Sequence, residues 1–255
     1  MIGRTSNPAL NKNTFEKFTY ANEQANAMTF TGAINKTGIM LLLVVLGAMY
    51  TWKLFFNSYN IESGTSAVMT WVAVGGIGGF ILSLITIFNQ KNSSIFAPIY
   101  AVLEGLFLGG ISAIFEASYP GIVLRAVALT FSVLFTMLFL YRTKMIKPTE
   151  RFKAGVISAT GGIVIMYFLS FIFSIFGANM SFLYGNSLLS IGISIFVVVI
   201  AALNLVLDFD FIEQGVQYKV PKYMEWYSAF GITVTLVWLY IEILNLLLKL
   251  SSRSR

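Results

Sequence analysis

The stretch ISIFVVVIAALNLVLDFDFIEQG, residues 193–215, decides the structural class of this protein. It is apolar almost throughout, until Asp208, Asp210 and Glu213 appear close together at its end. A continuous apolar run predicts a helix in lipid, because a strand of a membrane barrel would alternate with period two. An acidic side chain in such a helix costs about 2.5–3.5 kcal/mol and normally faces a bundle interior or water. We therefore expect these carboxylates to have a function.

The composition extends this interpretation to the whole chain. Of the 255 residues, 57% are hydrophobic and only 11% are charged, whereas about a quarter of the residues in soluble domains are charged. Most of the surface must then face lipid. The predicted fold class is an all-α integral membrane protein, with the lipid bilayer as its main partner.

Seven apolar segments reach the length of about 20 residues that a membrane-spanning helix needs. They cover residues 38–57, 66–88, 95–116, 121–142, 154–177, 186–212 and 226–248. The chain thus divides into a polar segment without a signal-peptide core, a transmembrane domain and a short basic tail, at 1–36, 37–250 and 251–255. Three glycine clusters, which suit close helix–helix approach, lie at 75–79, 105–110 and 160–162.

Most Lys and Arg residues lie in loops that a seven-span arrangement puts on one side of the membrane. They are Arg4, Lys12, Lys17, Lys36, Lys91, Arg142, Lys144, Lys147, Arg151, Lys153, Lys219 and Lys222. The positive-inside rule then predicts a cytoplasmic N-terminus. The basic residues at the C-terminal end, Lys249, Arg253 and Arg255, would lie outside, so a re-entrant or half-spanning last helix stays open as an alternative.

Two absent residue types exclude several kinds of chemistry. The chain has no Cys and no His, which excludes disulfides, thiolate nucleophiles, zinc sites that need imidazole and Ser-His-Asp hydrolysis. We expect no enzyme activity and no cofactor except a possible calcium ion. The net charge of +6 is explained by membrane topology, so no nucleic-acid partner is expected.

Glu242 is the clearest acid inside a span, because apolar residues flank it for more than a turn on both sides. Asn245 and Lys249 follow at helical spacing and can share its face. Glu242 is thus a candidate ion or proton site. The alternative is a structural role, in which Glu242 pairs with a buried amide or a lysine and ties helices together.

The acids after the apolar run are predicted to point in different directions. Asn204, Asp208 and Ile212 share one helical face, which we expect to point into the bundle. Asp210 is rotated by about 200° from Asp208 on a helix with 3.6 residues per turn, so the two cannot face one site unless the helix unwinds. Glu213, close to the membrane edge, is predicted to be a solvated interfacial residue.

Glu104 is a third interior acid, in the middle of the third apolar segment and beside glycines. A functional role and a helix–helix hydrogen bond made by its protonated form are both open for this residue.

Two carboxylates close together in a dry environment share a proton, and the titration belongs to the pair. When they are ionised, the same oxygens suit a hard cation such as calcium. Interior acids that meet inside the bundle would therefore form a pH-sensing and calcium-binding pair, the role that the resemblance described below implies for Asp208 and Glu242. Asn204, Asp210, Glu104 and Asn245 are the supporting polar residues.

Four short motifs, in their order and spacing, resemble the Bax inhibitor-1 superfamily, also called the TMBIM or YccA-type family. They are RTSNPALNKNTF (4–15), LEGLFLGG (103–110), LDFDFI (207–212) and LYIEILNLL (239–247). The resemblance covers essentially the whole chain, and the first motif is similar to that of the bacterial subgroup. It implies a seven-helix fold with a central last helix, a pH-sensitive calcium leak through the bundle, and a bacterial cytoplasmic membrane as the location.

Carried over by this resemblance, Asp208 matches the first acid of the family's di-aspartyl pair. Glu242 stands where the second acid is normally an aspartate, which changes the spacing of the pair by one methylene. Two further departures are a linker at 214–231 that looks longer than usual, and a second helix without the arginine that some members use as a latch. Gating by the same contacts is therefore not implied.

The leading hypothesis is a pH-sensitive calcium or cation leak channel gated by Asp208 and Glu242, with calcium ions and protons as ligands. A second hypothesis is a regulator of other membrane proteins, such as a stress-linked membrane protease, with residues 1–36 as the working part. An intramembrane aspartyl protease lacks a GxGD sequence here, and an ion-coupled transporter lacks a broken-helix signature.

Overall fold

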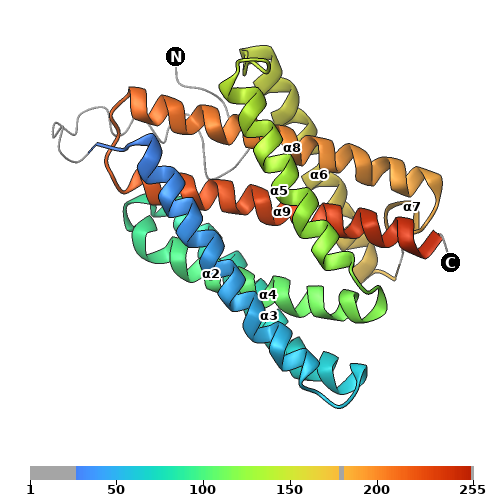
Figure 1. The fold of residues 1–255 in the computed structure, drawn as a ribbon. Helices are drawn as coiled ribbons and strands as arrows, with labels where there is room; N and C mark the ends of the chain where they lie inside the picture. The colour runs from blue at the N-terminus through green and yellow to red at the C-terminus, as the bar shows by residue number, and fades with distance from the viewer. Residues whose placement is uncertain (1–26, 178–180, 254–255) are drawn as a thin grey trace.

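The computed structural model describes residues 27–177 and 181–253. Seven helices in this part are long and apolar enough to cross a membrane, which confirms the predicted all-α, seven-span architecture. They are α2 (Phe30–Phe56), α3 (Ile61–Phe88), α4 (Ser93–Ser118), α5 (Ile122–Arg142), α6 (Glu150–Ile175), α8 (Leu188–Gln217) and α9 (Met224–Arg253). Two short elements, η2 (Gln90–Asn92) and α7 (Ser181–Tyr184), lie in the connections (Figure 1).

Most of the helices extend beyond the apolar runs that predicted them. The first begins at Phe30, inside the stretch assigned to the polar segment, because Thr29 caps it by accepting a hydrogen bond from the Gly32 amide at 3.0 Å. The last continues to Arg253 and has 30 residues, a length of about 45 Å. That length does not fit the half-spanning alternative, because a bilayer core is only about 30 Å thick.

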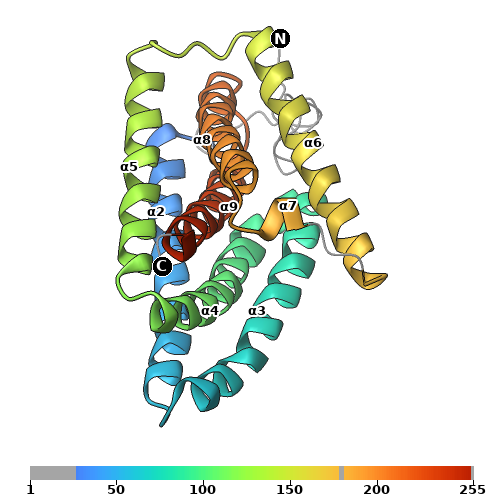
Figure 2. The ribbon, with the colours of Figure 1, turned by 90° about the vertical axis from the view of Figure 1, so that its right-hand side faces the viewer.

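The two C-terminal spans are the most buried of the seven. In both α8 and α9, 56% of the apolar window is buried, compared with 17–44% in the other spans. In Figure 2 these two helices are seen nearly end-on, with other spans around them. Besides α8, α9 contacts α2, α4 and α5. Side chains of α8 and α9 therefore have the least access to lipid.

Glycines let α4 approach its two neighbours closely. A Cβ added at Gly105 or Gly109 would overlap backbone atoms of α2, and one at Gly75 would lie 2.5 Å from the Leu103 carbonyl oxygen of α4. The close approach predicted for the clusters at 75–79 and 105–110 is thus confirmed. For the cluster at 160–162 the prediction is wrong, because a Cβ at either glycine would meet no atom within 4 Å.

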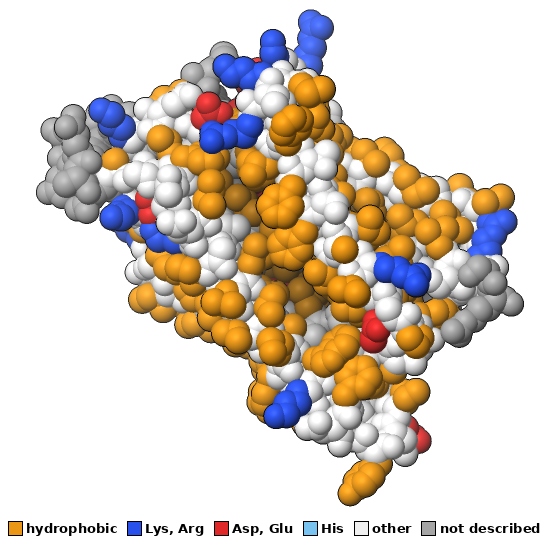
Figure 3. All heavy atoms as spheres, in the orientation of Figure 1, with side chains coloured by type: hydrophobic (Ala, Val, Ile, Leu, Met, Phe, Trp, Pro, Cys, Tyr) orange, Lys and Arg blue, Asp and Glu red, His pale blue; other side chains and the backbone are white. Residues whose placement is uncertain are grey.

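The surface is that of a multi-pass membrane protein. Large apolar side chains of the outer helices are exposed, among them Phe80 at 63% and Phe168 at 60%. Figure 3 shows hydrophobic side chains over the middle of one face and Lys and Arg side chains gathered toward its edges. This distribution suits a helix bundle with its apolar belt in lipid and its charged groups at the interfaces.

The connection between α8 and α9 is short, since only residues 218–223 lie outside the two helices. The long linker noted in the sequence is therefore mostly helical. The Met28 amide donates to the Val220 carbonyl at 2.8 Å, which fixes the start of the described chain beside this loop. Burial raises the pKa of the Tyr223 hydroxyl to about 12, so this loop tyrosine stays neutral near pH 7.

Candidate functional site

The interface between α8 and α9 carries a line of polar side chains, which we call the seam. The Thr235 hydroxyl of α9 donates to Asp208 of α8 at 2.6 Å. Near the other end, the Lys249 ammonium donates to the Ser194 hydroxyl at 2.7 Å. Thr235 and Lys249 are fourteen residues apart on α9, and Asp208 and Ser194 are fourteen residues apart on α8. The two contacts therefore have the same register between these antiparallel helices. Asp208 is fully buried.

Glu242 lies midway along the seam, seven residues from both Thr235 and Lys249. The shared register puts it opposite Ala201, whose small and fully buried side chain leaves room for a larger partner. The Glu242 carboxylate accepts hydrogen bonds from the Tyr167 hydroxyl of α6 at 2.9 and 3.1 Å, and from the Trp238 indole at 3.2 Å. Its exposed fraction is 4%.

The two predicted acids therefore belong to one interface, but they bind different donors. Asp208 meets α9 at Thr235, which lies two turns, or about 10 Å along the helix axis, before Glu242. Tyr167 and Trp238 bind Glu242, while Thr235 binds Asp208. Direct contact between the two carboxylates stays a prediction. Their separate hydrogen-bond donors favour two successive ion-binding positions along the seam, which we call stations.

Polar residues of α6 attach this helix to α8 and α9 at intervals of seven residues. Lys153 pairs with Asp210 at 2.6 Å, Thr160 accepts from the Asn204 amide at 2.9 Å, and Tyr167 donates to Glu242. Helix α6 packs mainly on α8 and lies at the edge of the bundle in Figure 2. Thr160 and Tyr167 were not predicted as site residues and Lys153 was expected in a loop, although a seven-residue spacing puts all three on one helical face.

The neighbours of Asp208 on α8 point as the helical rotation predicted. Asn204 and Ile212 are 2% and 1% exposed, which confirms that their common face with Asp208 points into the bundle. Asp210 points instead to Lys153 and also accepts from Gln214, and α8 stays continuous through this region. Glu213 is exposed and accepts a hydrogen bond from the Tyr141 hydroxyl.

The remaining supporting residues lie on other interfaces. Glu104 is half-buried between α3 and α4, where its carboxylate lies beside Gly79 and Tyr100. Asn245 lines a crevice of about 260 Å³ between α4 and α9, together with Phe107 and other apolar side chains. Both positions are separate from the hydrogen bonds that Asp208 and Glu242 make.

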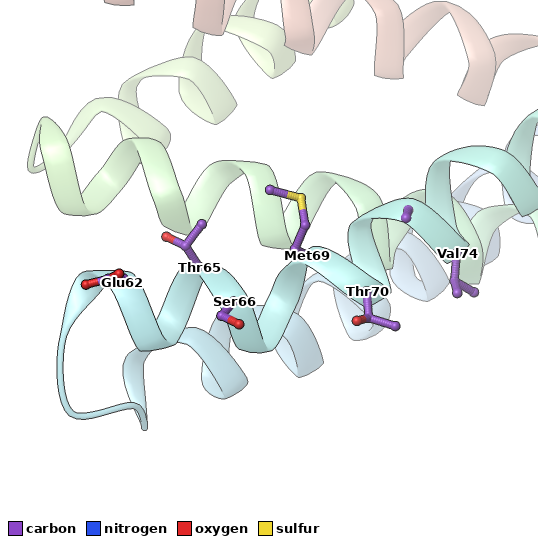
Figure 4. Close-up of a pocket in the computed structure, with 7 residues that line it drawn as sticks. Glu62, Thr65, Ser66, Met69, Thr70 and Val74 are labelled. Atoms are coloured by element: carbon purple, nitrogen blue, oxygen red, sulfur yellow. The ribbon is translucent and has the colours of Figure 1, made fainter.

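A larger and open hollow of about 930 Å³ lies along α3 (Figure 4). Side chains of α3 alone line it, from Glu62 to Val74. None of the predicted site residues is among them. In the described part of the chain, no group of three or more Asp, Glu, His or Cys side chains could hold a metal ion.

Tyr167→Phe should weaken the attachment of α6, because Glu242 keeps only the Trp238 donor among the hydrogen bonds described above. An under-satisfied buried carboxylate costs about 1–3 kcal/mol, and we expect the unfolding temperature in detergent to fall. Hydrogen exchange should also become faster in α6 but not in α2. Tyr59→Phe is the control, because the Tyr59 side chain is fully exposed. Equal unfolding temperatures for both variants would show that the Tyr167 hydroxyl does not hold α6.

The fold and the seam together define a polytopic helical membrane protein with carboxylates buried between its last two spans. The chain belongs to the Bax inhibitor 1 like family, whose model matches residues 7–252. No curated protein and no solved structure matches the chain. The family membership confirms the resemblance that the four sequence motifs indicated.

Proposed function

We propose that the protein is a passive, pH-sensitive cation leak, with calcium as the main ion and the seam as its path. One observation carries this proposal: Asp208 and Glu242 are buried in the same interface, two helical turns apart, between the two most buried spans. Acidic residues at this depth normally mark ion or proton pathways.

The seam offers the chemistry that a calcium ion needs. Calcium takes six to eight oxygen ligands. One station supplies the Asp208 carboxylate and the Thr235 hydroxyl, and the next supplies the Glu242 carboxylate and the Tyr167 hydroxyl. Water would complete the shell. Two incomplete shells in succession suit an ion that passes, since conduction requires that each site also release it.

Protons would regulate the leak by competing for the same oxygens. A carboxylate binds calcium in its ionised form, and a protonated carboxylic acid donates a hydrogen bond instead. Calcium binding at Asp208 and Glu242 should therefore weaken as the pH falls. We call the end of the bundle with the loops between α5 and α6 and between α8 and α9 the charged end. It would face the cytoplasm, and the membrane would be a bacterial cytoplasmic membrane.

Replacing Asp208 with Asn and Glu242 with Gln together tests this proposal. The change keeps the shape and removes both negative charges. We expect calcium flux into liposomes to fall by at least about tenfold, equivalent to a barrier higher by roughly 1.4 kcal/mol. The dependence of flux on pH between 6 and 8 should also disappear.

Glu62→Gln is the matched control, because Glu62 is an exposed acid on α3 outside the seam. It should leave both the flux and its pH dependence unchanged. If the double variant conducts calcium like the native chain at every pH, Asp208 and Glu242 are not the ion stations.

The second hypothesis, regulation of another membrane protein, depends on the polar N-terminal segment. Residues 1–26 of that segment lie outside the described residues. The Met28–Val220 hydrogen bond brings Met28, which belongs to this polar segment, close to the α8–α9 loop. Crosslinking followed by pull-down, comparing the full chain with a truncation that lacks residues 1–26, would separate this hypothesis from the leak.

A further inference from the structure

Lys249 is the last polar residue of the seam, two turns after Glu242 on the same face of α9. Its ammonium donates hydrogen bonds to three oxygens. These are the Ser194 hydroxyl at 2.7 Å, the Ser190 carbonyl at 3.4 Å and the Leu183 carbonyl of α7. The oxygens come from two elements, α7 and α8, that join α9 at this end of the bundle.

The hydrogen-bond partners of this side chain are unusual for a lysine near the end of a membrane helix. Such lysines normally keep the charged group in water. Lys249 instead reaches oxygens of buried residues, since Ser190 is fully buried and Ser194 is 4% exposed. Three charge-assisted hydrogen bonds offset the loss of water around the ammonium.

Two carbonyl oxygens and a hydroxyl oxygen are also the ligands that replace the water shell of a metal cation in a channel. We propose that Lys249 is a tethered cation, whose ammonium fills a three-oxygen cation site at the end of the seam and keeps mobile cations out. This inference rests on the proposed function, because the site ends the path on which Asp208 and Glu242 are the stations.

Electrostatics gives the size of the expected effect. Lys249 and Glu242 are about 10 Å apart along α9. A fixed positive charge at this distance from the Glu242 station would slow the arrival of a divalent calcium ion by roughly two-hundredfold, at an effective dielectric constant of about 20. A purely structural Lys249, which only fastens α7 to α9, would have no such effect on ion entry.

Lys249→Gln tests the inference in liposomes of phosphatidylcholine and phosphatidylglycerol. We expect calcium flux to rise by up to roughly two-hundredfold, because the charge that repels the divalent ion is gone. Lys249→Arg, which keeps the charge, should stay close to the native flux. The matched control is Lys53→Gln at the exposed C-terminal end of α2. Lys53 lies at the same end of the bundle as Lys249, because α2 and α9 start together at the other end and both lysines are near the C-terminal ends of their helices.

A second variant covers the case in which Lys249→Gln does not fold. Ser194→Ala removes one acceptor and keeps the lysine, so the ammonium should leave its site more often and flux should rise by a smaller factor. Native flux in both Lys249→Gln and Ser194→Ala would overturn the inference. A third result separates the two proposals: native flux in both of these variants, together with reduced flux in the Asp208→Asn, Glu242→Gln double variant. The proposed cation leak would then be supported, and only the tethered-cation role of Lys249 would be wrong.

A binding measurement decides the inference even when no variant conducts calcium. In Lys249→Gln a potassium ion can take the place of the ammonium, and an ion that binds only the folded state stabilises it. We expect the unfolding temperature of this variant to be higher in potassium chloride than in choline chloride. The native chain should show no such difference. Equal temperatures for the variant in both salts would exclude a cation site at these oxygens.

Discussion

Gly109→Ala should destabilise the protein strongly, although it adds only one methyl group. The new Cβ would overlap the Ala48 carbonyl oxygen and Cα of α2, and would also meet the Thr51 hydroxyl. Backbone atoms cannot move aside without separating α2 from α4. Overpacking of this kind costs about 1–3 kcal/mol and occasionally more, and we expect at least the upper end of that range. Thermal unfolding in detergent, followed by size-exclusion chromatography, measures the loss.

Gly162→Ala is the matched control for this prediction. Gly162 also lies inside a membrane helix, but a Cβ there would meet no atom within 4 Å. Alanine also favours the helix by about 0.8–1 kcal/mol relative to glycine, so this variant should be as stable as the native chain or slightly more stable. A Gly109→Ala protein that unfolds at the native temperature would mean that α2 and α4 are further apart than described.

The sequence was sufficient to predict the spans and the inward face of α8. Continuous apolar runs predict membrane helices because lipid leaves no other way to satisfy the backbone. The rotation between Asp208 and Asp210 follows from helical geometry alone. The structure agrees, since Thr235 binds Asp208 while Lys153, on another helix, binds Asp210.

The partners of the buried acids could not be predicted in the same way. A helical pattern gives the direction of each side chain, but not the register between two helices. Only that register puts the small Ala201 opposite Glu242, so that the Glu242 carboxylate can accept a hydrogen bond from Tyr167. The failure at Gly162 has the same cause, because small residues permit close packing without showing which helix, if any, lies beside them.

A buried ion pair that the sequence did not reveal joins the starts of α2 and α9. Glu225 is 1% exposed and forms a salt bridge with Lys36, whose side chain is 17% exposed. The same carboxylate accepts hydrogen bonds from the Thr29 amide at 2.9 Å and the Thr29 hydroxyl at 3.0 Å. Gly32 makes room for this carboxylate, because a Cβ at that position would overlap Glu225 Oε1. Glu225 therefore links the first and last spans.

Glu225→Leu should be the most destabilising single change on the charged end of the bundle. It removes one partner of a buried pair, leaves the Lys36 ammonium uncompensated and takes the acceptor from Thr29. Breaking a buried pair in this way costs about 3–5 kcal/mol. The unfolding temperature should fall accordingly. Glu150→Gln is the control, because Glu150 is 60% exposed and lies 3.7 Å from Lys153, a surface pair worth about 0–1 kcal/mol.

A double variant separates the pair itself from the charge left behind. Lys36→Met together with Glu225→Leu removes both charges, and apolar replacement of a buried pair is often neutral or even stabilising. The double variant should therefore be more stable than Glu225→Leu alone. If the losses in Lys36→Met and Glu225→Leu simply add, the two residues do not interact. The link between the first and last spans would then have to come from Thr29 and the apolar contacts around it.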